Sequence, residues 1–433
     1  MLCSVATLIH DTYLPVYLKE ELGLSNSRIG NLQAAAQFLS KASGTLSGTA
    51  ADLLSPSRMV VFGTLLTTVN KPMFAAAGAV YGGLGVTACL YWITFGKIFD
   101  RVSKGIREAP SKALIGDLAA ASGESPAAAF SLRQSLSTAG ALVGSGCAAL
   151  AFRLSRQNYV VTFALSCVPA ACALALVSVA LRSDGQGEKA REGTSKQSVI
   201  DGKKKVSNLE SHHQPSLVQK LRILLSALPP AYWQALAVVS LLYFARFDAS
   251  FVTLRASAAL PRSALPWLTS LMMIPQALLA TSAGLAARRS VRHRNAVLLG
   301  GIAVLVAANA CFALPPSRVA AMAGALLVGV HMALTHGVSV AMLASYIPTG
   351  ALPGLGRVAG TAWSFTDAVL GVILAYSNAL AGRLADASTR AGRGGVGCFY
   401  GGAVACVLSM LALAAFAGLG SLGTEEAVQK KQA

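Results

Sequence analysis

The feature that most constrains this chain is a succession of long apolar segments separated by short polar or Gly/Pro-rich breaks. A helix needs about 20 mainly apolar residues to cross the hydrocarbon core of a bilayer, and the apolar supply suffices for about twelve such helices. We expect spans near 1–18, 28–50, 59–80, 84–116, 128–152 and 158–181 in the first half, and near 232–256, 265–287, 296–314, 318–346, 358–382 and 397–420 in the second.

The composition is typical of a membrane protein. Hydrophobic residues make up 54% of the chain and charged residues only 12%, about half the charged share of soluble domains. An ordinary soluble enzyme, a disordered chain and a coiled coil are thereby excluded. Backbone groups in hydrocarbon must be bonded internally, and the segments have helical rather than strand lengths. We therefore predict an all-α, integral, multi-pass membrane protein with twelve transmembrane helices, in a membrane that the sequence does not identify.

A polar stretch divides the chain. Residues Arg182–Ser216 are rich in Gly, Ser and Lys and lack periodicity, which is typical of a flexible linker. The first apolar segment, Leu2–Leu18, is barely long enough to span, which leaves open whether its start is complete. We predict an N-terminal six-helix bundle at 1–181, a cytoplasmic linker at 182–230, a C-terminal six-helix bundle at 231–420 and a cytoplasmic tail at 421–433.

An internal repeat supports two pseudo-symmetric halves. The run Gly48-Thr-Ala-Ala-Asp followed by Arg58 is echoed by the run Gly284-Leu-Ala-Ala-Arg followed by Arg294, with ten positions between the Gly and the last Arg in each. Each run lies between the second and third expected helix of its half. Parallel repeats of six helices are an architecture of membrane transporters.

The charge balance is strongly basic. The chain has 36 Lys and Arg residues against 18 Asp and Glu residues, a formal net charge of +18. Such an excess suggests nucleic acid in a soluble protein; in a membrane chain we interpret it as charge that faces anionic lipid or lines a pathway. We expect the lipid bilayer, and no nucleic acid, as a partner. The placement of Lys and Arg puts the linker on the cytoplasmic side, although Arg383, Arg390 and Arg393 oppose that bias.

Three motifs carry a family resemblance. The segment Gly48–Arg58 is similar to the loop signature of the major facilitator superfamily, with Ser55 and Ser57 in place of a second Gly and a basic residue. Arg101-Val-Ser-Lys-Gly resembles the helix 4 pattern of that superfamily. The string from Asp100 to Asp117 is similar to a mostly prokaryotic subgroup with a KGIR-x-AP-x-x-ALI-x-D run in helix 4. The resemblance implies a secondary active transporter that works by alternating access, with a midplane site between two six-helix halves.

Helix 4 carries charge where a span should be apolar. Each Lys, Arg or Asp at a helix centre costs roughly 2.5–3.5 kcal/mol, so these residues must face a watery cavity, pair with one another or lie at the cytoplasmic end. A guanidinium binds carboxylate or phosphate through two parallel hydrogen bonds. The alternative is that they bond backbone carbonyls or form the gate. We predict that the substrate, a small anionic or polar solute, is bound by Arg101, Lys104, Arg107, Arg133 and Arg246.

Acidic residues inside spans are candidates for proton coupling. We predict this role for Asp11, Glu108 and Asp367. The alternative for Asp11 is an ion pair with a base of helix 4, and for Asp367 a buried structural pair. On helix 4 itself, the four-residue spacing predicts that Lys104 pairs with Asp100 and with Glu108.

A gating set follows from the resemblance and from helix bending. Gly48, Asp52 and Arg58 belong to the loop signature, whose charges link the halves on the cytoplasmic face. Gly105 and Pro110 would bend helix 4 and loosen its hydrogen bonds. In the second half, Arg246 is expected within a continuous helix 7, and His331 in a packing role.

Motifs for other functions are missing from the sequence. There is no P-loop, GxSxG or HExxH motif and no GxGxxG after a strand, so we predict neither an enzyme nor ATP-driven transport. The eight cysteines form no CxxC pair, so we predict no metal and no cofactor. We expect a monomeric secondary transporter with a small-molecule substrate and a coupling proton. The alternatives are an efflux pump for amphiphilic compounds, which a cavity lined by Phe, Met and Trp would favour, and a non-transporting membrane sensor or scaffold.

Overall fold

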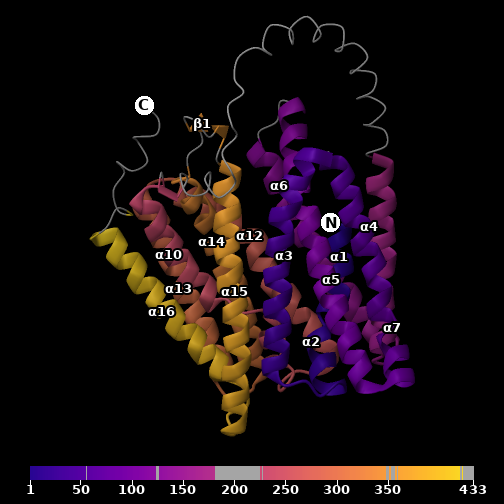
Figure 1. Cartoon of the computed structure of the whole chain (residues 1–433). Coiled ribbons are helices and arrows are strands. Elements are labelled where there is room, and N and C mark those ends of the chain that lie inside the picture. The colour runs from indigo at the N-terminus through magenta and orange to yellow at the C-terminus, as the bar shows by residue number, and fades with distance from the viewer. Residues whose placement is uncertain are drawn as a thin grey trace, which may run out of the picture.

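The computed structural model consists almost entirely of long helices that run side by side (Figure 1). It describes residues 1–54, 56–122, 126–180, 225–226, 228–347, 351–352, 356–357, 359–419 and 422. The predicted all-α class is confirmed. Most of the linker predicted at 182–230 and of the tail at 421–433 lies outside the described residues.

The first half supplies six spans. Gly85, with φ +82°, interrupts α5, so the residues before it continue the span of α4 and the residues after it form the next span. After a turn at Ser166, helical residues 167–180 complete the span that α7 begins. The elements are α1 (Leu2–Asp11), α2 (Leu14–Val16), the π-helical η1 (Tyr17–Glu21), α3 (Asn26–Leu54), α4 (Pro56–Ala75), α5 (Ala77–Ser122), α6 (Pro126–Leu154) and α7 (Tyr159–Leu165).

The second half supplies the other six. Its first span is broken, and a short antiparallel ribbon that the sequence did not predict pairs Ala351 with Arg357. The elements are α10 (Pro230–Ala245), α11 (Ala249–Ala256), the 3₁₀ turn η2 (Arg262–Ala264), α12 (Leu265–Ala287), α13 (Val291–Ala313), α14 (Arg318–Ala344), β1 (Ala351–Leu352), β2 (Gly356–Arg357), α15 (Ala359–Arg390) and α16 (Gly397–Gly418).

The helices differ in how apolar they are over the length of a membrane span. Among the described residues, nine helical segments are long and apolar enough to cross a membrane. The other three spans are those of α1–η1, α3 and α4. They carry polar side chains that face a cavity or a neighbouring helix, such as Gln33 on α3 and Lys71 on α4.

Local chemistry explains the helix ends. Asn158 accepts hydrogen bonds from the backbone N–H groups of Val160 and Val161 and starts α7; Ser290 and Ser317 start α13 and α14 in the same way. Asp248 accepts from the N–H of Ser250 and starts α11. The structure therefore corrects the expected continuous helix over 232–256: residues 246–248 are not helical, because a capping carboxylate begins a new helix there.

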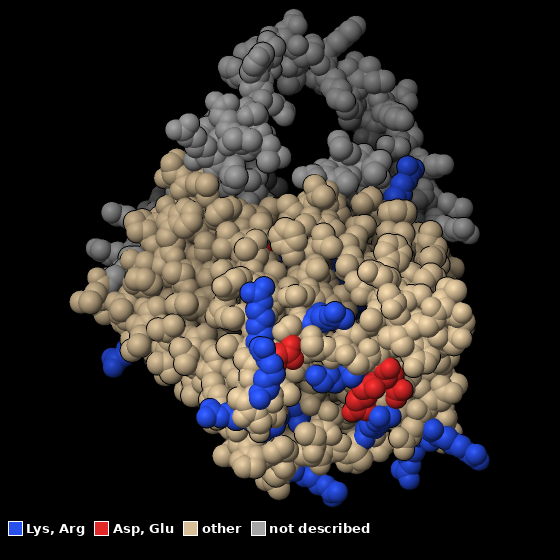
Figure 2. All heavy atoms as spheres, turned by 60° about the horizontal axis from the view of Figure 1, so that its bottom comes forward, with Lys and Arg blue, Asp and Glu red and all other residues tan. Residues whose placement is uncertain are grey.

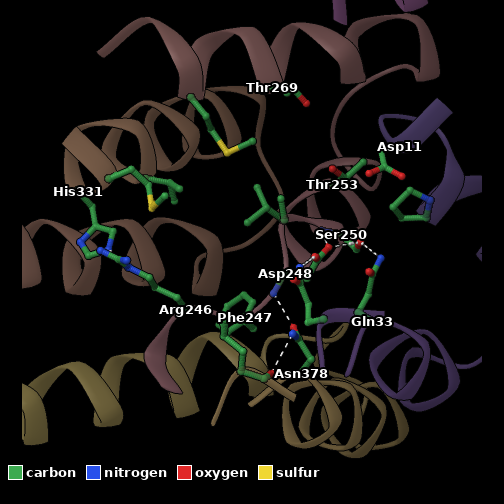
Figure 3. Close-up of a pocket in the computed structure, with 18 of the residues that line it drawn as sticks. Asp11, Gln33, Arg246, Phe247, Asp248, Ser250, Thr253, Thr269, His331 and Asn378 are labelled. Atoms are coloured by element: carbon green, nitrogen blue, oxygen red, sulfur yellow. Dashed lines mark hydrogen bonds between the residues drawn. The ribbon is translucent and has the colours of Figure 1, made fainter. Parts of the chain in front are cut away.

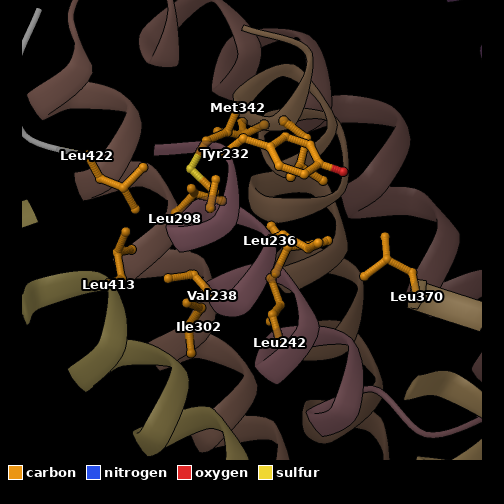
Figure 4. Close-up of a cluster of buried hydrophobic side chains, with 14 of the residues drawn as sticks. Tyr232, Leu236, Val238, Leu242, Leu298, Ile302, Met342, Leu370, Leu413 and Leu422 are labelled. Atoms are coloured by element: carbon orange, nitrogen blue, oxygen red, sulfur yellow. The ribbon is translucent and has the colours of Figure 1, made fainter. Parts of the chain in front are cut away.

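Each half has its own apolar core. In the second half, side chains of α10, α13, α14, α15 and α16 meet in a cluster around Tyr232, Leu298 and Met342 (Figure 4). In the first half, aromatic rings stack, with the ring centroids of Tyr13 and Phe152 4.2 Å apart. The helices thus form two bundles, each held by its own dispersion contacts.

The two bundles meet along α3 with α15 and along α6 with α12 (Figure 1). At the end away from the linker, the carboxylate of Asp386 accepts hydrogen bonds from the backbone N–H groups of Asn26 and Ser27, both at 2.8 Å. Arg262 forms ion pairs with Glu20 and Glu21 at the same end. The bundles are therefore joined at the end of the molecule opposite the linker.

The contact between the two bundles becomes more exposed to solvent toward the linker side. Along α3, Gln33 is buried, whereas the side chain of Lys41 is 36% exposed. Along α5, Lys97 and Lys104 both face the space between the bundles, and Lys97 is buried while Lys104 is exposed. Because exposure rises toward the linker on both helices, water reaches the space between the bundles from that side.

Replacement of Gly382 by Ala should destabilise the protein. A Cβ at this position would lie 2.5 Å from the carbonyl oxygen of Asn26, and overpacking a close contact costs about 1–3 kcal/mol. The matched control is Gly300→Ala, because a Cβ at Gly300 meets nothing within 4 Å. A thermal unfolding curve of each purified variant checks this; equal melting temperatures would contradict the tight contact of α3 with α15.

Candidate functional site

A cavity of about 460 Å³ lies between the bundles. Helices α1, α3 and α5 line it on one side, and helices α10 to α16 line it on the other. Its volume falls in the range of small-molecule sites, about 300–1,000 Å³. Figure 3 shows that Arg246 and His331 lie on one side of this pocket, and Asp11 and Gln33 on the other.

The first bundle contributes a shared ion pair. Asp11 on α1 places Oδ1 2.5 Å from Lys97 Nζ and Oδ2 2.7 Å from Arg101 Nη2. The structure thus bears out the ion-pair alternative for Asp11. Lys97 was not among the predicted substrate residues, although its position in an apolar span was a signal. One carboxylate faces two cations, so this group of three side chains carries one net positive charge.

A second ion pair lies behind this wall. Lys71 Nζ on α4 contacts Asp100 Oδ1 on α5, and both side chains are buried. The predicted pairing of Asp100 with Lys104 is wrong, because Asp100 points to α4 while Lys104 is exposed in the cavity. His10 stacks on Phe74 with ring centroids 4.2 Å apart.

The second bundle contributes an arginine held by neutral groups. Arg246 Nε donates to His331 Nε2 at 2.8 Å, and Nη2 donates to Thr335 Oγ1. His331 Nδ1 lies 2.7 Å from the carbonyl oxygen of Gly301. A carbonyl only accepts, so Nδ1 carries the proton and Nε2 is the acceptor, and this imidazole is neutral. His331 therefore does more than pack: it positions the guanidinium.

Arg246 has no acidic partner in the part of the chain that the structure describes: no carboxylate oxygen there lies within 4.0 Å of its nitrogens. It lies in the break between α10 and α11 and lines the cavity. Its charge is thus desolvated by the protein but not neutralised by it.

Polar groups form a set of hydrogen bonds at the cavity, one of which joins the two bundles. Gln33 Nε2 on α3 donates to Ser250 Oγ on α11 at 2.8 Å, and Ser250 Oγ donates to Asp248 at 2.5 Å. Asn378 Oδ1 on α15 accepts from the backbone N–H of Asp248 at 2.6 Å (Figure 3). Sequence reasoning missed Gln33, Ser250 and Asn378. One signal existed: Gln33, Gln37 and Lys41 are spaced by four on one face of α3.

Apolar side chains from the second bundle complete the lining. They are large and polarisable or aromatic, which suits varied apolar ligands. They come from α12, α13, α14, α16 and the break before α11: Met272, Met273, Phe312, Met332, Phe399 and Phe247.

A further ion pair crosses between the bundles. Lys41 Nζ on α3 lies 2.7 Å from Asp367 Oδ1 on α15, with 36% and 41% of the two side chains exposed. Neither residue lines the cavity. Asp367, predicted as a proton site, is thus placed in a half-exposed pair between the bundles.

Of the predicted substrate residues, the cavity brings together Arg101, Lys104 and Arg246. Arg107 and Arg133 do not line it; Arg107 packs against Gly63 of α4. Their contact with substrate stays a prediction. Glu108 is half-buried on α5, also away from the cavity lining.

The predicted gating residues lie toward the linker. Gly105 packs against α3, where Ser47 Oγ donates to its carbonyl oxygen at 3.2 Å. Pro110 lies buried within α5, and Arg58 is exposed in the first turn of α4. The surroundings of Gly48 and the side chain of Asp52 lie outside the described part of the structure. The structure therefore leaves the gating role as a prediction.

Comparison with known proteins identifies the class. The family model described as Major Facilitator Superfamily matches residues 1–366, so the chain belongs to this superfamily. It is a secondary transporter and an integral multi-pass membrane protein, not an enzyme. Among proteins of curated function, none matches the chain.

Solved structures share the fold. A D-xylose-proton symporter matches with a TM-score of 0.68 and 14% identity, covering 95% of both chains. The nucleoside transporter NupG matches with 0.67 and 14%, covering 96% of both. A peptide transporter POT in complex with sulfate matches with 0.66 and 16%, covering 97% of this chain and 93% of that one. At these identities the likeness shows the fold of two six-helix bundles.

The ion pair between Lys71 and Asp100 should be structural. Asp100→Asn leaves a buried lysine unpaired and should cost about 3–5 kcal/mol, whereas replacing both partners with apolar residues is often neutral. We expect Lys71→Met combined with Asp100→Leu to recover most of the thermal stability that Asp100→Asn loses. A double variant as unstable as the single one would contradict a purely structural pair.

Proposed function

We propose that this chain moves a small solute with an anionic group across the membrane by alternating access of the bundles 1–181 and 231–420. The observation that carries the proposal is the charge of the cavity lining. Lys97, Arg101 and Arg246 outnumber Asp11 and Asp248, and Lys104 adds a further exposed cation. An anion between the bundles offsets this excess in a site of low dielectric, where charge matters most.

The family position supports a transporter without naming its solute. The string from Asp100 to Asp117 supports placing the chain in the mostly prokaryotic subgroup that it resembles. Each bundle is complete within one chain, which supports a monomer as the working unit.

The face opposite the linker supports an anionic solute independently. Lys and Arg side chains gather there, with few acidic groups among them (Figure 2). A basic face raises the local concentration of anions, so it would favour their entry when alternating access opens the cavity to that side. The helix ends at that face contribute the exposed or half-exposed residues Lys19, Arg28, Arg153, Arg156, Arg262, Arg318, Arg383, Arg390 and Arg393.

Proton coupling fits Asp11 best among the three predicted acids. It alone lines the cavity, and its carboxylate holds both Lys97 and Arg101. Protonation of Asp11 removes the charge that binds these cations and frees them for an anion. A proton and an anion would then travel together. Among the solved relatives, the D-xylose-proton symporter is named for proton coupling.

Gating fits the residues near the linker. We assign Lys41 with Asp367 to closure on that side, because they join α3 to α15 while still half-exposed. Gly48, Asp52, Arg58, Gly105 and Pro110 lie on or next to the helices that would move, and we keep them in the gating set.

A second candidate is efflux of amphiphilic compounds. The six Met and Phe side chains of the cavity lining favour it. It differs from the first candidate in that neutral and cationic amphiphiles would be carried as well as anions.

Flux measurements separate these functions. The purified chain is placed in liposomes that hold a pH-sensitive dye, and carboxylates, phosphate esters, sugars, nucleosides and aliphatic amines are added outside. We expect only the anions to carry protons inward. Asp11→Asn should lose this proton movement and keep exchange of the anion, while Arg289→Gln, an exposed loop control, should behave as the native chain. Flux confined to neutral or cationic solutes would reject the anion assignment.

The pair of Lys41 and Asp367 allows a charge-swap test. Because both side chains are half-exposed, the pair is worth about 0.2–1 kcal/mol, and its loss should change flux by a factor of about 1.4 to 5. We expect Lys41→Asp alone and Asp367→Lys alone to shift the rate, and the two together to restore it. Failure of the swap to restore the rate would show that the residues do not act on each other.

A further inference from the structure

We propose that the cavity is a site for an organic monoanion with an apolar body, whose acidic group binds Arg246 and whose body packs on the Met and Phe side chains. The inference deepens the proposed function and rests on it, because it names the substrate class of the same cavity.

Arg246 is the cation that an acidic group can reach at the lowest cost. Lys97 and Arg101 already share Asp11 at 2.5 and 2.7 Å, so a ligand would have to compete with that carboxylate. Among the described residues, Arg246 donates side-chain hydrogen bonds only to the neutral groups His331 and Thr335, and its guanidinium lies 5.3 Å from the ring centroid of Tyr243, which is also neutral. These fix the guanidinium without cancelling its charge, and a carboxylate gains more from a charged, preorganised donor than from a neutral one.

The surroundings of Arg246 decide the rest of the ligand. Met272, Met332 and Phe399 line the same half of the cavity, and no further cation of the described chain lines it on the second bundle. A second acidic group would therefore lie on an apolar wall, or would have to reach the first bundle, where Asp11 already occupies Lys97 and Arg101 (Figure 3). Lys104 also lines that side, but it is exposed to water, where pairing with an acid stabilises little. Burying an unpaired charge is costly, so the site favours one acidic group and an apolar body.

The size is consistent with this class. A cavity of about 460 Å³ accommodates a body of the size of a phenylalkyl or medium alkyl chain. Inorganic phosphate or acetate would leave the Met and Phe side chains without contacts.

Binding of defined probes to the full purified chain tests the inference. We would titrate 4-phenylbutyrate and octanoate, the neutral isostere 4-phenylbutyramide, the cation 4-phenylbutylamine, and the compact anions succinate and phosphate, and measure Kd by calorimetry. We expect the two apolar monoanions to bind at least about tenfold more tightly than every other probe. The amide and the amine lack the negative charge that pairs with Arg246. Succinate and phosphate lack an apolar body that contacts the Met and Phe side chains.

Variants locate the anchor. Arg246→Gln should weaken 4-phenylbutyrate by about tenfold or more, Arg246→Lys should retain part of the affinity, and Arg289→Gln should retain all of it. The ligand series on the native chain needs no variant, so it decides the charge and shape preference even if Arg246→Gln fails to fold.

The other outcomes separate this inference from the proposed function. Succinate or phosphate binding as tightly as 4-phenylbutyrate overturns the monoanion class but leaves an anion transporter. Binding lost in Lys97→Met and unchanged in Arg246→Gln overturns the anchor alone. Equal affinity for the amide or the amine overturns both. No binding of any probe, with flux of another anion, overturns the inference and leaves the function.

Discussion

The structure depends on one constraint, that an ionised side chain within a membrane span must find an opposite charge or a polar cavity. Helix α5 places Lys97, Asp100 and Arg101 within a few residues of one another, and the fold resolves them in two ways. Asp100 turns inward and is matched by Lys71 inside the first bundle. Lys97 and Arg101 turn to the cavity and share Asp11. In the first arrangement the two charges cancel. In the second, one positive charge remains uncompensated and faces the space between the bundles.

The second bundle meets the same constraint with different chemistry. The break between α10 and α11 carries Arg246 into the cavity, where a neutral imidazole and a hydroxyl hold it. The helix dipole and the capping carboxylate of Asp248 stabilise the restart of the chain at Ala249. Two pseudo-equivalent halves thus face each other with unlike walls: one holds an ion-paired cluster, and the other holds Arg246 and Asp248, which do not pair, among Met and Phe side chains. This asymmetry is the basis of the proposed preference for a solute with an anionic group and an apolar body.

The contacts between the bundles differ at the two ends of the molecule. At one end the bundles are tightly packed, and at the other end their contact is exposed to water. Asp386 bonds two backbone N–H groups of α3 directly, and Gly382 lets α15 approach α3 closely at that end. At the other end the pair of Lys41 and Asp367 is half in water, where an ion pair is weak. Among the described residues, each bundle has its own apolar core, and the side-chain bonds that cross between the bundles are separate from those cores.

The sequence by itself determined the all-helical membrane class, because span length and apolar content depend on local residues alone. It also singled out the charges of helix 4 and Asp11, since charge in a span is costly wherever it lies. Only the tertiary structure decided the partners. Asp100 meets Lys71 rather than Lys104, and Arg246 meets His331 in a broken helix. Gln33 meets Ser250 across the bundles. These contacts depend on helix rotation and on packing between segments far apart in the chain. Those relations have no signature in local periodicity, because the same spacing of residues allows several neighbours until the helices are packed.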